Sequence, residues 1–214
     1  MHDISIAMGS ATPEWPGDTP FSCGWTWRMR DGASVNVSAI TTSPHVGTHA
    51  DAPLHVRDGW PASDELPLDA FVGRAVVCTV RAGVETITLD DLRTLPREGR
   101  IERLLLRTDC TIAGGRFPDA WPAFALDALR ALLDRGLRLL GVDAPSVDLR
   151  ESKTLDVHHL LFEHSANVLE NLDLRDVEDG AYELVAMPIK VVGADAAPVR
   201  AALEAVVSRR SSVV

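Results

Sequence analysis

The chain has 214 residues, of which 46% are hydrophobic, and we expect it to fold as one domain spanning residues 1–214. Its 21 basic and 31 acidic residues give a formal net charge of −10, which disfavours nucleic acid and anionic membrane surfaces as partners. We find no signal-peptide pattern and no apolar run close to the roughly 20 residues that cross a bilayer, so we expect a cytoplasmic protein.

Four segments in the first two thirds of the chain have the patterns of β-strands. Residues 34–42 alternate and are rich in β-branched side chains, which predicts a strand that leads directly into a histidine-rich segment. Residues 74–80, 103–108 and 137–145 are short apolar runs, which are typical of buried strands.

Helices are predicted between these strands. Residues 88–96 begin with a capping threonine and an acidic first turn and end before a proline, which predicts a short helix. Residues 122–136 have proline at the start, apolar residues at helical spacing and glycine at the end, so they give the clearest helix. A further helix is expected over 155–165.

The C-terminal part of the chain returns to strand patterns. Strands are expected around residues 167–171 and 183–191, whereas the polar tail from Ser208 is expected to be frayed. The alternation of strands and helices along the chain predicts an α/β fold.

The segment "SPHVGTHADAPLH" concentrates groups that can bind metals or move protons, namely His45, His49, Asp51 and His55. Glycine and proline inside the segment argue against a helix. The four positions are separated by even numbers, so an extended backbone would direct them to one side. A flat strand would hold His45 and His49 too far apart to share an ion, so we expect the backbone to bend at Gly47.

Imidazole nitrogens together with a carboxylate suit zinc, manganese or iron(II). His45, His49 and Asp51 form such a set, and they leave coordination positions for water or substrate. The three cysteines lie far apart without a C-x-x-C motif, so a thiolate zinc site is not indicated. The alternative is that these are ordinary loop residues, which their number and spacing disfavour.

A second group of donors follows in "LDVHHLLFEHSANVLENL" and comprises His158, His159, Glu163, His164 and Glu170. These are more donors than a site requires, so most of them must be structural or solvated. Asp51 could bridge to a second ion that one histidine and one glutamate of this group complete. The residues alone leave the choice among them open.

Motifs along almost the whole chain resemble the bacterial kynurenine formamidases, metal-dependent amidohydrolases of the cyclase-like family. They include "WPGDTPF", "SPHVGTHADAPLH", "GVDAPSVD", "ESKTLDVHH", "VLENLDL" and "DAAPVRA". The resemblance implies hydrolysis of N-formyl-L-kynurenine to L-kynurenine and formate in tryptophan degradation. It further implies a swivelling β/β/α domain and a homodimer.

The same resemblance implies a site with two zinc ions per subunit, or manganese in their place. His45, His49 and Asp51 would bind the first ion, and Asp51 would bridge to a second ion held by His158 and Glu170. A metal-activated hydroxide would attack the formyl carbonyl. His55 would act as the proton shuttle, and Trp15 would contact the substrate.

Two alternatives remain beside this interpretation. One is a family member that opens a cyclic amide such as isatin, with the same metals and a different pocket. The other is a non-catalytic metal-binding protein, against which His55 argues because a structural zinc site needs no further histidine beside its ligands.

Overall fold

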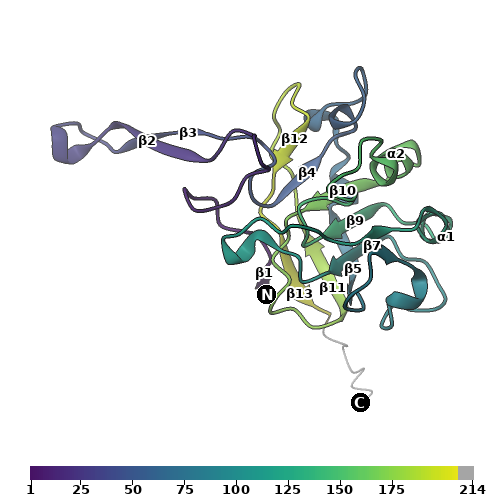
Figure 1. Cartoon of the computed structure of the whole chain (residues 1–214). Helices are drawn as coiled ribbons and strands as arrows, with labels where there is room; N and C mark the ends of the chain where they lie inside the picture. The colour runs from purple at the N-terminus through teal and green to yellow at the C-terminus, as the bar shows by residue number, and fades with distance from the viewer. Residues whose placement is uncertain (207–214) are drawn as a thin grey trace, which may run out of the picture.

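The computed structural model describes residues 1–206 and shows a mixed α/β fold built on a large sheet (Figure 1). The predicted tail from Ser208 lies outside these residues. In sheet order the strands are β1 (His2–Asp3), β13 (Ala202–Ala205), β11 (Gly180–Val185), β5 (Val72–Thr79), β7 (Arg103–Arg107), β9 (Leu139–Val142), β10 (Asn167–Glu170), β4 (His49–Asp51) and β12 (Ala196–Pro198). Neighbours among β5, β7, β9 and β10 are parallel, and the other pairs are antiparallel.

Helices α1 (Leu126–Asp134) and α2 (Asp156–Glu163) lie beside each other on one face of the sheet (Figure 1). Successive strand residues point to opposite faces, so Leu104 and Leu106 of β7 pack against the helices while Leu105 points away from them. The helix-covered face therefore holds one hydrophobic core, and the predicted buried strands supply it.

The opposite face of the sheet holds a second core to which neither helix contributes. It combines Leu203 of β13 and Ala50 of β4, which come from opposite ends of the sheet order. Side chains this far apart in a sheet share one cluster only when the sheet curls. A backbone bridge between Ser5 and Leu172 also ties the N-terminal edge to the segment that follows β10.

The hairpin of β2 (Ser22–Trp27) and β3 (Val37–Thr41) projects away from this body (Figure 1). Every residue of β2 is exposed, including Trp25 and Trp27, and Ile40 of β3 is exposed as well. An isolated two-stranded hairpin is marginally stable in water. The predicted strand 34–42 is thus present in shortened form, but it belongs to the projecting hairpin.

Residues 1–206 also contain six short 3₁₀ turns, namely η1 (Met29–Asp31), η2 (Pro53–His55), η3 (Ser63–Glu65), η4 (Leu68–Ala70), η5 (Leu89–Asp91) and η6 (Ile112–Gly114). The helix predicted over 88–96 is wrong in extent, because only the single turn η5 forms behind its capping threonine. The helix predicted from Pro122 begins at Leu126, because residues Ala123–Phe124 form strand β8 beside β6 (Thr86–Ile87). Strand β11 ends at Val185, which is earlier than predicted.

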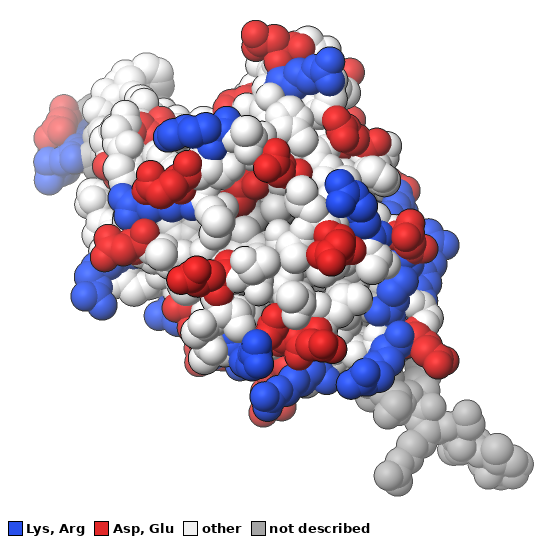
Figure 2. All heavy atoms as spheres, turned by 45° about the vertical axis from the view of Figure 1, so that its right-hand side comes forward, with Lys and Arg blue, Asp and Glu red and all other residues white. Residues whose placement is uncertain are grey.

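Acidic and basic side chains are intermixed over the face shown in Figure 2, so neither sign of charge gathers in one area of this face. Among residues 1–206, no helix has both the length and the apolar character needed to cross a membrane.

Candidate metal centre and its pocket

The register between two strands places the first three donors of the site. Strand β4 pairs antiparallel with β10, so that Glu170 lies opposite His49 and Val168 lies opposite Asp51. Because Ala50 points into the second core, His49 and Asp51 point to the helix-covered face. Glu170 shares that face with Val168, and its Oε2 lies 3.6 Å from His49 Nε2.

Helix α2 adds His158 from above the same face. Its Nε2 lies 3.2 Å from Asp51 Oδ2 and 3.3 Å from Glu170 Oε1. Asp148 fixes this orientation, because its carboxylate accepts a hydrogen bond from His158 Nδ1 at 2.7 Å and others from the backbone N–H groups of Val157 and His158. Asp148 therefore holds both the imidazole and the first turn of α2.

His45 reaches the site from the turn before β4. Gly47 in this turn has φ +73°, and a Cβ atom there would lie 2.9 Å from Met8 Cγ. The bend expected at Gly47 is confirmed. It brings His45 Nδ1 to 3.1 Å from His49 Nε2 and to 3.1 Å from Asp51 Oδ1.

Each of these three imidazoles donates one ring N–H away from the centre. His49 Nδ1 donates to the Gly47 carbonyl at 2.9 Å, and His158 Nδ1 donates to Asp148. The contact of His45 Nε2 with Asp195 Oδ2, at 2.9 Å, does the same for the third ring. In the neutral tautomers that result, three bare nitrogens face the carboxylates of Asp51 and Glu170. Acceptors converge on acceptors, so the centre requires protons or a cation.

The pKa values of the site residues also indicate that the centre needs protons or a cation. Burial by itself would lower the pKa of His45, but Asp195 and Asp51 outweigh it and raise the pKa to about 10. Burial is likewise outweighed at His49, where Asp51 and Glu170 raise the pKa to about 9. Burial opposes ionisation of Asp51, yet His49, His158 and His45 hold its pKa well below the usual range.

The donor set fits a divalent metal by a further observation. Asp51 Oδ1 is buried and accepts no hydrogen bond, although the ring nitrogens of His45 and His49 lie 3.1 Å and 3.3 Å away. A buried carboxylate oxygen without a hydrogen bond is costly, and a cation shared with the neighbouring nitrogens would remove that cost. Nitrogen and carboxylate donors of this kind suit zinc or manganese.

Within residues 1–206, donor atoms lie within 4.8 Å of one another in two overlapping groups, which are His45 with Asp51 and His55, and His49 with Asp51 and Glu170. Asp51 belongs to both groups, as a bridging carboxylate would. The division differs from the predicted one, in which His45 and His49 share an ion and His55 binds none.

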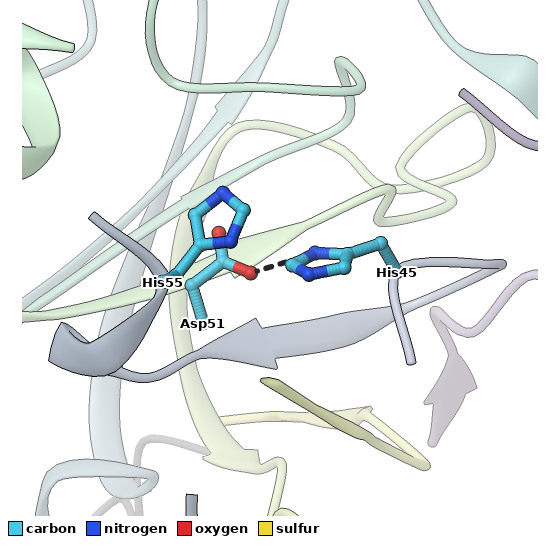
Figure 3. Close-up of side chains that lie close together, drawn as sticks. All are labelled: His45, Asp51 and His55. Atoms are coloured by element: carbon cyan, nitrogen blue, oxygen red, sulfur yellow. Dashed lines mark ion pairs between the residues drawn. The ribbon is translucent and has the colours of Figure 1, made fainter. Parts of the chain in front are cut away.

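His55 stands at the end of η2, just after β4, and the ring lies across from His45 with Asp51 between them (Figure 3). The ring centroids of His45 and His55 are 4.5 Å apart, and the His55 side chain is 30% exposed. The even spacing in the sequence does not explain this proximity, because only His49 and Asp51 are on extended backbone. A turn on each side of β4 brings the two outer histidines back to the centre.

A cavity of about 300 Å³ opens beside the centre. It is lined by Pro13, Trp15, Asp18, His45, His55, Phe117, Pro145, Ser146, Leu155, His158, Glu170 and Asn171. Trp15 forms part of its apolar wall, because its ring meets Phe117 and Trp121 edge to face at centroid distances of 5.4 Å and 5.8 Å.

The remaining donors of the second group stay outside the centre. Glu163 and His164 are exposed, and the ring of His159 packs edge to face against Trp60. The residues by themselves could not separate His158 from His159, and the structure places His158 in the centre. Asp148 and Asp195 were not predicted from the sequence to be site residues. Each nevertheless lies within a motif on which the resemblance rests, "GVDAPSVD" and "DAAPVRA" respectively.

The chain is similar in sequence to known proteins over most of its length. The sequence profile of the Cyclase family matches residues 2–149. Kynurenine formamidase from Bordetella avium (strain 197N) is 43% identical over 202 residues, which cover 94% of this chain and 96% of the relative. The chain belongs to the Cyclase family. The resemblance to kynurenine formamidases found in the sequence is thereby confirmed.

Solved structures of Cyclase-type proteins agree with the fold. A structure described as a potential metal-dependent hydrolase with cyclase activity has a TM-score of 0.79 at 29% identity, covering 94% of this chain and 96% of that chain. Isatin hydrolase A from Ralstonia solanacearum has a TM-score of 0.76 at 20% identity, covering 94% and 89%. The second likeness shows the shared fold alone.

Proposed function

We propose that this chain hydrolyses N-formyl-L-kynurenine to L-kynurenine and formate, as a step of tryptophan degradation. The observation that carries this proposal is the 43% identity to a kynurenine formamidase over nearly the full length of both chains. The chain is accordingly an enzyme, a hydrolase that acts on the C–N bond of a linear amide.

Two zinc ions, or manganese in their place, are the proposed cofactors. His45, His49 and Asp51 would hold the first ion, and Asp51, His158 and Glu170 would hold the second. The two oxygens of Asp51 support this division, because Oδ1 faces His45 and His49 while Oδ2 faces His158. When bound, such ions supply Lewis acidity, which polarises a carbonyl and brings the pKa of water down to about 7.

His55 is the proposed proton shuttle. It lines the cavity and its ring is partly exposed, so substrate and water can reach it. As a water oxygen bonds to the formyl carbon, the imidazole takes the proton that the water loses. As the C–N bond breaks, the imidazole returns that proton to the departing aryl amine nitrogen. One water is consumed; the free amine and formic acid leave, and the acid releases its proton to solvent to become formate.

The cavity suits an aromatic substrate. Trp15 and Phe117 form an apolar wall at right angles to each other, and an aryl ring can pack edge to face or offset against them. The metal centre lies at the same cavity through His45, His158 and Glu170, so a ring on this wall would direct its formyl group to the donors.

The alternatives receive less support. No observation favours a cyclic amide such as isatin over a linear formamide, because the isatin hydrolase is only 20% identical. A non-catalytic metal protein would not explain why His55 stands beside the donors at a cavity that can admit a ligand.

The homodimer also belongs to this proposal. The projecting hairpin supports it, because Trp25, Trp27 and Ile40 are each more than half exposed and lie on strands that no other layer within residues 1–206 covers. A second copy could cover these side chains. The swivelling β/β/α form of the domain, its extent over residues 1–214 and the cytoplasmic location stay predictions of the sequence.

A direct comparison of substrates tests the proposed function. Purified protein supplied with zinc is mixed with N-formyl-L-kynurenine, and the absorbance of kynurenine is followed, while a parallel reaction contains isatin. We expect rapid turnover of the formamide and little or none of isatin. The reverse pattern would favour the cyclic amide hydrolase.

A further inference from the structure

Asp195 stands where two segments of the site meet, and the backbone holds it there. It directly precedes β12, whose first residue, Ala196, pairs with Asp51 of β4. The carbonyl of Asp195 accepts a hydrogen bond from the backbone N–H of Ala52 at 2.9 Å. The preceding carbonyl, of Ala194, accepts one from the N–H of Ser63 at 2.8 Å. The carboxylate therefore projects from a fixed position.

One oxygen of this carboxylate meets two histidines. Asp195 Oδ2 lies 2.9 Å from Nε2 of His45 and 3.4 Å from Nδ1 of His55. The centroids of the two rings are 4.5 Å apart, so a single carboxylate oxygen can contact both rings. The side chain of Asp195 is 44% exposed, and its removal leaves no large cavity in the core.

We propose that Asp195 is a positioning residue that orients the metal ligand His45 and the proton shuttle His55 together; this inference rests on the proposed function. By accepting the Nε2–H of His45, the carboxylate leaves the Nδ1 lone pair facing the metal centre. By accepting the Nδ1–H of His55, it leaves Nε2 of that ring as the atom that takes and returns the proton. Loss of Asp195 would loosen both rings at once.

Asp148 provides a useful contrast within the same chain. It orients His158 through Nδ1 and also receives backbone N–H groups of α2, so its loss would disturb the helix. The side chain of Asp195 contacts the two histidines without any such bond to a helix. Replacement of Asp195 therefore separates ring orientation from folding.

The principal test replaces Asp195 by alanine and measures two properties. Zinc affinity, from competition with a chromophoric chelator, should fall about 10- to 100-fold because His45 is no longer oriented. At saturating zinc, kcat for N-formyl-L-kynurenine should fall about 10- to 100-fold, while KM changes less than about threefold. Asp134→Asn, on the exposed end of α1, is the matched control and should change neither property.

A double variant shows whether Asp195 lowers or raises kcat through His55 or independently of it. If Asp195 acts through this ring, His55→Ala combined with Asp195→Ala should have the kcat of His55→Ala alone at saturating zinc. Multiplicative losses would overturn the proposal, and so would a loss in only one of zinc affinity and kcat. Should Asp195→Ala fail to fold, Asp195→Asn keeps the size of the side chain and is expected to change both properties in the same direction.

A spectroscopic arm needs no substrate and keeps this inference distinct from the proposed function. Nitrogen-15 NMR of the histidine rings should show His55 as the Nδ1–H tautomer in the unmodified protein and as a mixture in Asp195→Ala. An unchanged His55 tautomer would overturn the positioning role even if the enzyme hydrolyses the formamide. If the unmodified enzyme does not hydrolyse it, the proposed function fails, and the NMR and zinc measurements still decide the role of Asp195.

Discussion

Asp51 on β4 and His158 on α2, which are 107 positions apart in the sequence, meet with Oδ2 and Nε2 separated by 3.2 Å. The other oxygen of Asp51 faces His45 and His49. One carboxylate thus joins the strand donors to the helix donor, so we expect the candidate metal centre to depend on it more than on any single histidine.

Replacement of Asp51 by alanine should therefore empty the site of metal. Both proposed ions share this carboxylate, so zinc affinity should fall more than about 100-fold. Metal content after purification, measured by mass spectrometry, checks this expectation, with Asp134→Asn as the exposed control. Retention of a full metal load by Asp51→Ala would contradict the bridging role.

Replacement of His55 by alanine should leave the metal content near that of the unmodified enzyme and lower kcat about 10²- to 10⁴-fold. The reason is that a proton shuttle is lost while the five proposed ligands remain. His55 also lies in a donor group with His45 and Asp51, so the opposite outcome is well defined. If His55→Ala loses metal as completely as Asp51→Ala, His55 is a ligand.

Trp15→Ala should raise KM for N-formyl-L-kynurenine about fivefold, which corresponds to about 1 kcal/mol of aromatic contact, and should change kcat little. Trp15 is 38% exposed, so the fold should persist. Trp15→Phe, which keeps an aromatic wall, is the matched control and should recover most of the affinity. Circular dichroism and metal content accompany the kinetics. Unfolding, or an unchanged KM, would show that Trp15 serves only to pack against Phe117 and Trp121.

Metal binding should release protons. In the metal-free centre the pKa values of His45 and His49 are raised to about 10 and about 9. At pH 8 both rings are therefore imidazolium ions, with a proton on each nitrogen, and a metal that binds must displace one proton from each ring. Zinc affinity should therefore rise as the pH increases toward these values. Calorimetry at pH 8 in buffers of different ionisation enthalpy should detect more than one proton released per chain. A binding enthalpy that does not depend on the buffer would contradict this expectation.

The central strands could be predicted from the sequence because they are buried on both faces. Residues 74–80, 103–108 and 137–145 are largely apolar for that reason, and most of β5 and all of β7 and β9 lie within these segments. The hairpin of β2 and β3 shows the limit, because alternation alone does not reveal whether a strand joins the main sheet.

The sequence indicated the donor residues of the candidate site, but it did not indicate the residues that orient these donors. His45, His49 and Asp51 stand close together in the sequence, so they could be grouped as donors directly, although a turn at Gly47 and not their even spacing brings His45 to the centre. Asp195 acts across a long sequence separation, since it lies 150 positions from His45. Asp148 lies only 10 positions from His158, but a loop and the start of α2 separate the two residues. No periodicity links such residues, because their proximity arises from the pairing of β12 with β4 and the packing of α2 on the sheet.

Metal-dependent hydrolysis of N-formyl-L-kynurenine is the most direct test of the proposed function. Purified protein is treated with a chelator, assayed for formation of kynurenine, and assayed again after zinc or manganese is restored. We expect the chelated protein to be inactive and activity to return with the added metal. Full activity in metal-free protein, or no kynurenine formation with either metal, would contradict it.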